Sequence, residues 1–432
     1  MIARAVAFLR GTLVQRALTL GVGAAVGQAA VVGVTPLLAR IYDKGDFGVL
    51  AVVLALTGVG VVISSLRYEQ AIVVAETDEE ASAAAKAAGG FSLLTVLVAS
   101  LLALAVGDAL ARWTNSPALR DVLWMVPVII AAGAGHQMLV AWATRRGDFR
   151  ALSQAKAALG IGLAVSQLVL GFVFDGAVGL VAGVGIAWFV AIVFLVPAAG
   201  GLTWASDRAA WEAIRRYRRF PEFSLFASLF NRGALEIPAV ALAALYGPEV
   251  AGAFLLANRM VATPARLVTE SAYQVYLNEA SRLLRDDPSG LVYLFRRTLR
   301  RMALRCAPAV LVLALAGPPL LVWVFGDEWS DSASYVRLLA VLFAAMLVTQ
   351  PVESTLWLLE RQDLQLLRDV ARVVMVSGAF LAAWWLDASA IGAVAAYVGA
   401  MVAGYAFLLL LCRLLLQQQP EPAAASVEPA VA

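Results

Sequence analysis

Apolar stretches long enough to cross a lipid bilayer recur along almost the whole chain, separated by short polar segments. Each covers roughly 18 to 27 residues, which as a helix matches a hydrocarbon core of about 30 Å. We count twelve, beginning near Leu13, Phe47, Ala83, Val122, Ala151, Val178, Phe220, Val250, Leu304, Tyr335, Val370 and Ile391. The pattern predicts an all-α integral membrane protein with about 12 transmembrane helices, of which the second, eighth and ninth are candidates to extend beyond the membrane.

The composition agrees with this class and excludes a single soluble core. Hydrophobic residues make up 62% of the chain, charged residues 15%, and the mean hydropathy is +0.82. Arg4, Arg10 and Arg16 precede the first apolar stretch, as in a signal peptide, but the stretch from Ala17 to Ala39 is longer than a signal-peptide core. We therefore expect an uncleaved first helix.

The distribution of basic residues predicts the orientation in the membrane. The net charge is only +3, from 33 basic and 30 acidic residues, and gives no reason to expect a nucleic-acid partner. With the N-terminus inside, 23 of the basic residues fall in the termini and the even-numbered loops, Arg368 and Arg372 among them, and 5 fall on the opposite side. The positive-inside rule then predicts a multi-pass membrane protein with both termini in the cytoplasm.

A polar connection from Thr203 to Arg219 divides the chain into two halves of six helices. Its two tryptophans, Trp204 and Trp211, stand one heptad apart beside a basic cluster, which is typical of a helix lying at the membrane interface. Such a helix would tether the halves or dock a cytoplasmic enzyme. The expected domains are residues 1–200, a linker helix at 201–219, residues 220–416, and a tail at 417–432 whose composition predicts disorder.

The halves carry a faint repeat at an offset of 204 residues. Tyr42 aligns with Tyr246 and Gly48 with Gly252, each pair inside a similar helical hairpin. One interpretation is a duplication in which the two lobes are related by an axis along the membrane normal, with a substrate site between them. The alternative is chance similarity between two hairpins rich in Ala and Leu.

Two of the apolar stretches contain charged residues at membrane depth. A charge at this depth is costly unless it faces a protein interior or a watery cavity. The spacing of four, three and four residues along the eighth stretch, and of four along the seventh, places these charges on single helix faces. We therefore expect an enclosed polar path lined by Arg232, Glu236, Arg259, Arg266 and Glu270.

These charges have two interpretations. In the first, Arg232 pairs with Glu236 and Arg266 with Glu270, and the pairs only hold the bundle together. In the second, the excess of one positive charge and the lack of an acidic residue at i±3 or i±4 of Arg259 favour binding of an anion, since a guanidinium matches phosphate oxygens. Arg232, Arg259 and Arg266 are the predicted anion-binding residues.

Weaker candidates lie nearer the predicted cytoplasmic side. Arg67 and Glu69 either line the cavity or reach the interface, and i, i+2 residues do not face each other on a helix. Pro351 predicts a kink beside Glu353, which would pair with Arg361 or Arg372, or bind a proton or sodium ion. Together with Glu236 and Glu270, they are the polar cavity or ion-coupling candidates.

Nothing in the sequence indicates a metal site, a cofactor or a catalytic group. Cys306 and Cys412 lie in or beside apolar stretches without metal-ligand spacing, and we expect buried free thiols. His136 has no Cys, Asp or Glu at i+3 or i+4, which favours a hydrogen-bonded histidine within the membrane over a metal ligand.

Four short motifs, in this order, resemble a known family. They are Pro36-Leu-Leu-Ala-Arg-Ile-Tyr-Asp-Lys-Gly-Asp-Phe-Gly48, Leu66-Arg-Tyr-Glu-Gln-Ala-Ile72, Arg145-Arg-Gly-Asp-Phe149 and Leu359-Glu-Arg-Gln-Asp363. On a chain of twelve helices they resemble the Wzx-type oligosaccharide flippases of the multidrug/oligosaccharidyl-lipid/polysaccharide exporter superfamily. The resemblance implies a V-shaped fold of two six-helix lobes, and a transporter rather than an enzyme.

By the same resemblance, the substrate would be an undecaprenyl-diphosphate-linked oligosaccharide repeat unit, moved across the inner membrane by alternating access and driven by a proton or sodium gradient. Cavity arginines would hold the diphosphate or acidic sugars, and a polysaccharide polymerase and glycosyltransferases would be partners. The alternatives are a lipid II flippase, a drug or cation antiporter, and a membrane polymerase or ligase. The basic cavity disfavours the antiporter, and the short outer loops disfavour the enzyme.

Overall fold

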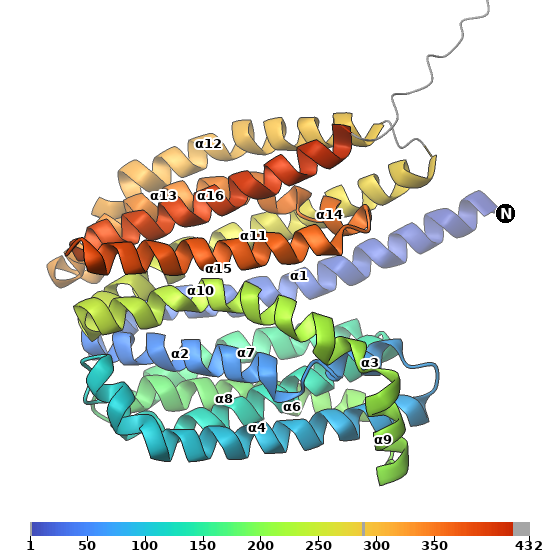
Figure 1. Cartoon of the computed structure of the whole chain (residues 1–432), viewed down its shortest axis with the longest axis horizontal. Coiled ribbons are helices and arrows are strands. Elements are labelled where there is room, and N and C mark those ends of the chain that lie inside the picture. Colours follow the sequence, from blue (N-terminus) through green and yellow to red (C-terminus); the bar gives the residue numbers. More distant parts are fainter. Residues whose placement is uncertain (1, 287–289, 418–432) are drawn as a thin grey trace, which may run out of the picture.

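The computed structural model describes residues 2–286 and 290–417, and every regular element in these ranges is helical (Figure 1). Twelve of the described helices have 18 residues or more, which confirms the predicted all-α architecture. The tail predicted at 417–432 lies, beyond Gln417, outside the described residues.

The first lobe contains six long helices and two short ones. Its elements are α1 (Ile2–Ile41), α2 (Lys44–Ser64), α3 (Glu69–Val74), α4 (Asp78–Trp113), α5 (Leu119–Val122), α6 (Met125–Arg146), α7 (Phe149–Leu170) and α8 (Val178–Leu195). Helix α7 packs closely on both α1 and α8, and α6 packs on both α8 and α4. Helix α9 (Asp207–Arg216) follows in the connection to the second lobe.

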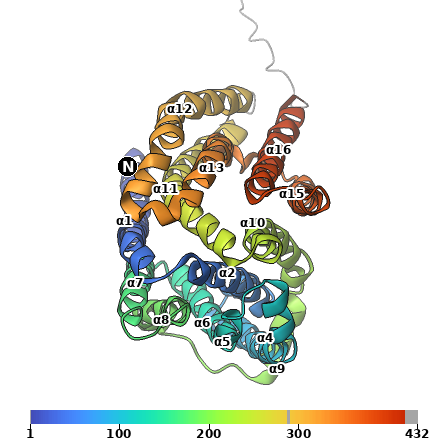
Figure 2. The ribbon, with the colours of Figure 1, turned by 90° about the vertical axis from the view of Figure 1, so that its left-hand side faces the viewer.

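The second lobe repeats this plan. Its elements are α10 (Leu225–Tyr246), α11 (Pro248–Asp286), α12 (Gly290–Phe325), α13 (Ser330–Thr349), α14 (Thr355–Leu358), α15 (Gln362–Trp385) and α16 (Ala390–Gln417). Figure 2 shows the two groups of helices end-on, with α2 and α10 lying at the boundary between them. We call the end of the bundle that carries the α1–α2 and α10–α11 turns the hairpin end, and the opposite end the basic end.

Ten of the described helical segments are long and apolar enough to cross a membrane. The two long helices outside this set are α11 and α15, and both carry charged residues in their middle turns. With these two, the structure has the twelve long helices that the sequence predicts. Helices α11 and α12, with 39 and 36 residues, exceed the length of a span, as expected for the eighth and ninth stretches.

The prediction that the second stretch extends as helix is wrong. Helix α2 ends at Ser64 because Leu66 and Arg67 adopt positive φ angles of 48° and 67°. Left-handed backbone cannot continue a right-handed helix, and the chain turns here into the short helix α3.

The motif after the fourth long helix has a local explanation. Gly147 ends α6 in the left-handed conformation with φ 68°, and the Asp148 side chain accepts a hydrogen bond of 3.0 Å from the backbone N–H of Ala151 at the start of α7. Glycine tolerates this φ at no steric cost, and aspartate is a favoured N-cap. The Gly-Asp pair therefore sets a tight α6–α7 turn.

The lobes meet through two glycines at the hairpin end. A Cβ at Gly48 would lie 1.9 Å from the carbonyl oxygen of Pro248, and a Cβ at Gly252 would lie 1.9 Å from that of Lys44. Pro248 lies 204 residues after Lys44, and Gly252 lies 204 residues after Gly48. Each of the helices α2 and α11 therefore places its fifth residue against the first residue of the other helix. This reciprocal packing, which only glycine permits, is what a twofold-related pair of hairpins requires, and it supports the predicted duplication.

Further contacts across the lobes surround these glycines. The Lys44 ammonium lies 2.8 Å from the carboxylate of Asp331, at the start of α13. The Phe47 ring meets the buried Trp329 ring edge-on, with centroids 5.3 Å apart. The hairpin end is thus sealed by backbone contact, by aromatic packing and by one ion pair.

The aligned tyrosines have equivalent roles inside their own lobes. The Tyr42 hydroxyl donates to the carbonyl of Gln167 near the end of α7, and the Tyr246 hydroxyl donates to the carbonyl of Ala388 just after α15, both at 2.8 Å. Helices α7 and α15 are the fifth long helices of their lobes. Each tyrosine therefore satisfies a carbonyl at the end of the fifth helix and fixes the first helical hairpin against it.

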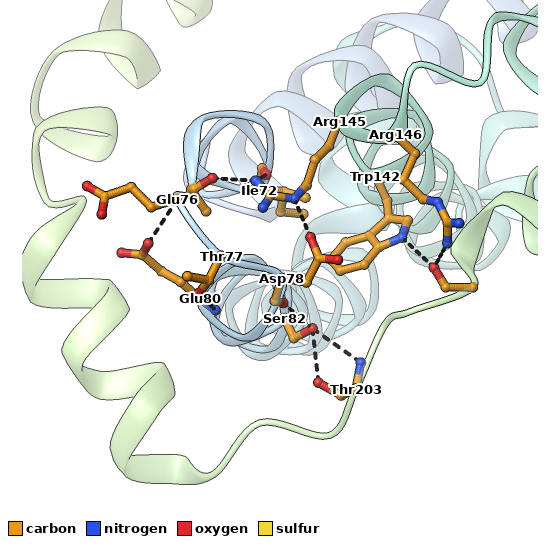
Figure 3. Close-up of polar contacts among 12 residues, drawn as sticks. Ile72, Glu76, Thr77, Asp78, Glu80, Ser82, Trp142, Arg145, Arg146 and Thr203 are labelled. Atoms are coloured by element: carbon orange, nitrogen blue, oxygen red, sulfur yellow. Dashed lines mark hydrogen bonds and ion pairs between the residues drawn. The ribbon is translucent and has the colours of Figure 1, made fainter.

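The connection between the lobes docks on the basic end of the first lobe (Figure 3). Arg145 donates to the Asp78 carboxylate at 3.0 Å, and to the carbonyls of Ile72 and Ala75. The backbone N–H of Thr203 donates to the Ser82 hydroxyl at 3.2 Å. These contacts gather α3, α4, α6 and the connecting segment at one point.

Helix α9 is amphipathic and lies across the bundle direction (Figure 1). Arg216 forms ion pairs with Glu76 at 2.6 Å and Glu80 at 3.0 Å. A hydrogen bond from Lys86 holds the pKa of Asp207 below its usual range. The helix predicted at 201–219 is shorter than expected, since α9 covers only Asp207–Arg216. Trp211 on α9 and Trp204, which lies before it, are both exposed.

Candidate functional site

A chain of buried charges runs through the second lobe. Arg368 of α15 pairs with Glu353 and, at 2.7 Å, with Asp369. Asp369 also lies 3.3 Å from Arg372, which donates to the side chain of Asn231 on α10. The side chains of Arg368 and Asp369 are only 4% and 3% exposed. The chain links α10, α15 and the segment before α14 by charge-assisted hydrogen bonds.

Local sequence explains how these residues meet. Arg368 and Arg372 are four residues apart and share one face of α15, with Asp369 next to both. On the neighbouring segment, Pro351 ends the regular helix, since α13 stops at Thr349 and a 3-10 turn (Gln350–Val352) follows. The predicted kink is confirmed, and it turns Glu353 towards α15.

Two predictions about this region are wrong. Glu353 pairs with Arg368, not with Arg361 or Arg372, because Arg361 points to Asp363 at 2.8 Å and Arg372 turns towards Asp369 and α10. Arg368 and Arg372 are also not loop residues, since α15 begins at Gln362 and buries both. Two fewer basic residues then lie on the predicted cytoplasmic side. This side still has more basic residues than the opposite side, so the predicted orientation is the same.

Arg232 lies at the boundary between the lobes. Its guanidinium is 2.6 Å from the Glu236 carboxylate one turn later on α10, as the structural interpretation predicts. It also reaches α2 of the first lobe, because a Cβ at Gly58 would lie 2.5 Å from its Nη2 atom. The side chain is 43% exposed, so pairing with Glu236 leaves part of it accessible.

The charged residues in the central part of α11 have different surroundings. Arg259 is partly buried and engaged in an interaction within the protein. Glu270 is exposed and accepts a hydrogen bond of 3.0 Å from Gln274. The side chain of Arg266 lies outside the described residues.

Arg67 and Glu69 do form a pair, at 3.1 Å, although they are only two residues apart. The helical argument against this contact fails because Leu66 and Arg67 are left-handed and the segment is not a helix. Glu69 is buried and also accepts a hydrogen bond from Ser65. The pair stabilises the turn between α2 and α3 and lies at the basic end, away from the membrane-depth charges.

The remaining candidates are the two cysteines and His136. Cys412 is buried, Cys306 is half-buried, and both are free thiols, as predicted. His136 packs edge-on against Trp188 at 4.7 Å, but its buried Nε2 has no hydrogen-bond partner among the described residues, so the expected hydrogen bond at this atom is absent. No group of three potential metal ligands occurs within the described part of the chain.

Sequence reasoning missed the centre of the charged chain. Arg368, Asp369 and Arg372 carried a usable signal, since two arginines and an aspartate on one face just inside an apolar stretch are typical of a buried network. The error came from placing the start of the eleventh span too late, near Val370, when the helix begins at Gln362.

The described charges inside the second lobe form pairs, and the partly exposed guanidinium of Arg232 stands at the lobe boundary. The buried chain balances formally, with two arginines against Glu353 and Asp369, and Arg232 balances Glu236. The central part of α11 adds two arginines and one glutamate to the sequence of this lobe.

Comparison with solved structures identifies the fold. The chain is similar to the lipid II flippase MurJ in an inward closed conformation, with a TM-score of 0.74 and 10% identity over 93% of this chain and 87% of MurJ. It is also similar to an inward-facing multidrug resistance MATE family transporter of the MOP superfamily, with a TM-score of 0.62 and 16% identity over 93% and 96% of the two chains. These likenesses confirm the predicted exporter-superfamily fold.

Sequence comparison adds the family. The succinoglycan biosynthesis transport protein ExoT of Rhizobium meliloti is 24% identical over 315 residues, which cover 71% of this chain and 61% of ExoT. The chain thus spans about three-fifths of the length of this relative. Residues 37–334 match the family model described as polysaccharide biosynthesis protein, and the proteins matched are transporters rather than enzymes. The chain belongs to the polysaccharide biosynthesis protein family, and its fold is the one seen in transporters of the MOP superfamily.

Proposed function

We propose that this transporter moves undecaprenyl-diphosphate-linked oligosaccharide repeat units across the bacterial inner membrane by alternating access of its two lobes. The observation that carries the proposal is the excess of one positive charge in the central part of α11, where Arg259 and Arg266 stand with Glu270, in a member of a polysaccharide biosynthesis family. A lipid-linked diphosphate brings the anionic group that such a helix would recognise, and a guanidinium matches its oxygens. A cationic drug would need the opposite charge.

In this proposal Arg232, Arg259 and Arg266 contact the anionic headgroup. Arg232 is the best supported of the three, because it is partly exposed and lies between α10 and α2, where relative motion of the lobes would change its surroundings. The buried chain around Asp369 holds α10 and α15 together and does not contact substrate.

In this proposal a proton or sodium gradient drives transport, and the coupling ion binds to a carboxylate group. Glu353 already neutralises Arg368, which makes it a poor site for a cation. Glu236 is likewise paired, with Arg232, so Glu270 is the better candidate because it is exposed and accepts its hydrogen bond from the neutral Gln274. Replacing each by Gln and measuring transport against imposed proton and sodium gradients would identify the coupling group.

A double-variant experiment separates anion binding from structural pairing. Transport would be measured as accumulation of lipid-linked oligosaccharide on the cytoplasmic face of cells that lack the native protein, together with the amount of folded protein. Arg232→Gln combined with Glu236→Gln removes the pair without leaving a lone charge. We expect this variant to be folded and to lose transport, whereas Arg208→Gln on the exposed face of α9 should transport normally.

Two outcomes would contradict the proposal. Normal transport by the double variant would exclude Arg232 as a headgroup contact. Absence of accumulated lipid-linked oligosaccharide when the protein itself is deleted would exclude the function.

The orientation belongs to the same proposal. Both termini would lie in the cytoplasm, where glycosyltransferases supply the substrate, and a polysaccharide polymerase would use the product on the other side. A periplasm-active reporter should work when fused after Trp385 and fail when fused after Arg413. The reverse pattern would invert the topology.

A further inference from the structure

A groove of about 930 Å³ lies within the second lobe, between α11, α12 and α13. Figure 2 shows these three helices together on one side of the lobe. Helix α12 packs along α13 but makes few contacts with α11, and the space between them forms the groove. Its volume is at the upper end of the range of about 300–1,000 Å³ that is usual for ligand sites.

One part of the groove is apolar. Its walls there are Val310 and Leu313 of α12 with Phe343 and Leu347 of α13, and Val261 of α11 lies opposite. Aliphatic and aromatic side chains of this kind accept a hydrocarbon chain and offer nothing to a sugar.

The other part carries a ladder of arginines. Arg297, Arg301 and Arg305 stand at intervals of four residues on α12 and all line the groove. At 1.5 Å per residue the ladder spans about 12 Å. Arg297 stacks on Tyr293 at 5.9 Å. Among the described residues, neither Arg301 nor Arg305 has an ion-pair partner.

The position of the ladder along α12 relates it to the bilayer. The segment from Cys306 to Phe325 contains no charged residue and has the length of about 30 Å that a hydrocarbon core requires. Arg305 therefore stands where hydrocarbon gives way to headgroups, and Arg301 and Arg297 follow at headgroup depth. The groove crosses this boundary, with its apolar part inside and its basic part outside.

Resting on the proposed function, we propose that this groove binds a polyprenyl phosphate or diphosphate lipid, with the isoprenoid chain along Val310 and Phe343 and the phosphate on Arg301 and Arg305. A diphosphate has more negative charge than a phospholipid phosphodiester and can engage two guanidinium groups one turn apart. Glu279 is the single acidic residue among those that line the groove, so the charge excludes a cationic ligand. The site is distinct from Arg232 at the lobe boundary.

The chain provides a matched control for the charge. Arg296 and Arg300 belong to the same two turns of α12 but are exposed and do not line the groove. Arg301→Gln with Arg305→Gln removes two charges from the groove, and Arg296→Gln with Arg300→Gln removes two charges from the same helix elsewhere. A general effect of basic residues at the interface would appear in both variants.

The apolar part has a similar control. Ala309 lines the groove, whereas Ala303 is exposed on another face of α12. Ala309→Phe fills the groove next to the expected chain, and Ala303→Phe adds the same bulk towards the surrounding lipid.

The test is binding to the purified full-length protein in nanodiscs of zwitterionic lipid, measured by native mass spectrometry. The probes are undecaprenyl phosphate, undecaprenyl diphosphate, phosphatidylglycerol and inorganic diphosphate. We expect the Arg301/Arg305 variant to bind both polyprenyl probes at least tenfold more weakly, because two charge-assisted hydrogen bonds are lost. The Arg296/Arg300 variant and Ala303→Phe should bind within about twofold of the native protein, and Ala309→Phe should bind more weakly.

Three results would overturn the inference. Equal losses in the two double-arginine variants would make the effect one of general surface charge. Displacement of undecaprenyl diphosphate by an equal amount of phosphatidylglycerol would make the groove an ordinary phospholipid site. Full competition by inorganic diphosphate would show that the hydrocarbon chain has no part in binding.

The same variants distinguish this inference from the proposed function. If cells with the native protein translocate lipid-linked oligosaccharide but binding is unchanged in the Arg301/Arg305 variant, the groove assignment fails and the function stands. If the native protein binds undecaprenyl diphosphate in the groove but its deletion causes no accumulation of lipid-linked oligosaccharide, the function fails and the groove assignment stands.

Discussion

The two lobes share a topology but place their charges differently. All six long helices of the first lobe are apolar enough to cross a membrane, and its ion pairs, such as Asp108–Arg120 and Arg145–Asp78, lie near helix ends. In the second lobe only four long helices qualify, and the Arg368–Asp369–Arg372 chain is buried inside.

This difference shows that two lobes of the same topology are stabilised in different ways. The first lobe is held mainly by apolar packing, and the α9 connection docks on its basic end. The second lobe accepts the desolvation of several charges, which apolar residues of similar size would avoid. The reciprocal glycines at the hairpin end are the feature that both lobes contribute equally.

The largest effect is expected from breaking the buried chain. Asp369→Asn removes the carboxylate between two buried arginines. Glu353 still compensates Arg368, so one buried positive charge is left uncompensated, which should cost about 3–5 kcal/mol of stability. The first-lobe control, Asp108→Asn, loses an exposed pair with Arg120 and should cost about 0–1 kcal/mol. Thermal unfolding in detergent and the amount of protein in the membrane measure both. Equal losses in the two variants would refute the contrast between the lobes.

The next effect concerns the contact between the lobes. Gly48→Ala places a methyl group against the backbone of the other lobe, and overpacking of this kind costs about 1–3 kcal/mol. We expect the hairpin end to open, as measured by distances between spin labels on the two lobes, and Gly252→Ala to act in the same way. Gly33→Ala is the control, since nothing lies within 4 Å of a Cβ there. Opening by only one of the two glycine variants would disprove their equivalence.

A smaller effect is expected at the basic end of the first lobe. Arg145→Ala removes donors from the carbonyls of Ile72 and Ala75 as well as from Asp78, and should cost about 1–2 kcal/mol. The loss should loosen α3 from α6, which hydrogen exchange of residues 69–78 would detect. Arg150→Ala, an exposed residue at the start of α7, should leave exchange unchanged. Unchanged exchange in the Arg145 variant would show that apolar packing alone holds α3.

The smallest effect is a pH dependence of α9 docking. The Lys86 contact lowers the pKa of Asp207 in the folded protein, so folding is favoured at a pH above the ordinary value for aspartate, about 4. This contribution should be present at neutral pH and lost as the pH falls below that value. The unfolding temperatures of the native protein and Asp207→Asn should therefore differ slightly at pH 7 and converge at pH 3. A difference that grows on acidification would contradict the assigned sign.

The sequence by itself determined the membrane class, the number of long helices and the position of the connection between the lobes. These follow from the length of each apolar stretch and from polar breaks such as Thr203–Arg219, which are local properties of the chain. It also indicated the repeat, and the α6–α7 turn has a local origin in Gly147 and Asp148, since backbone φ and capping depend on neighbouring residues.

Only the tertiary structure decided which charges meet. Arg368 lies 15 residues from Glu353, and Arg372 lies 141 residues from Asn231, so helical spacing could not reveal either contact. The Arg67–Glu69 pair depends on left-handed backbone at Leu66 and Arg67, and neither residue type favours that conformation. The groove likewise exists because α12 packs on α13 and stands away from α11, which brings apolar and basic residues of three helices into one site. A periodic sequence fixes the faces of a helix, whereas the packing angles between helices determine which faces meet.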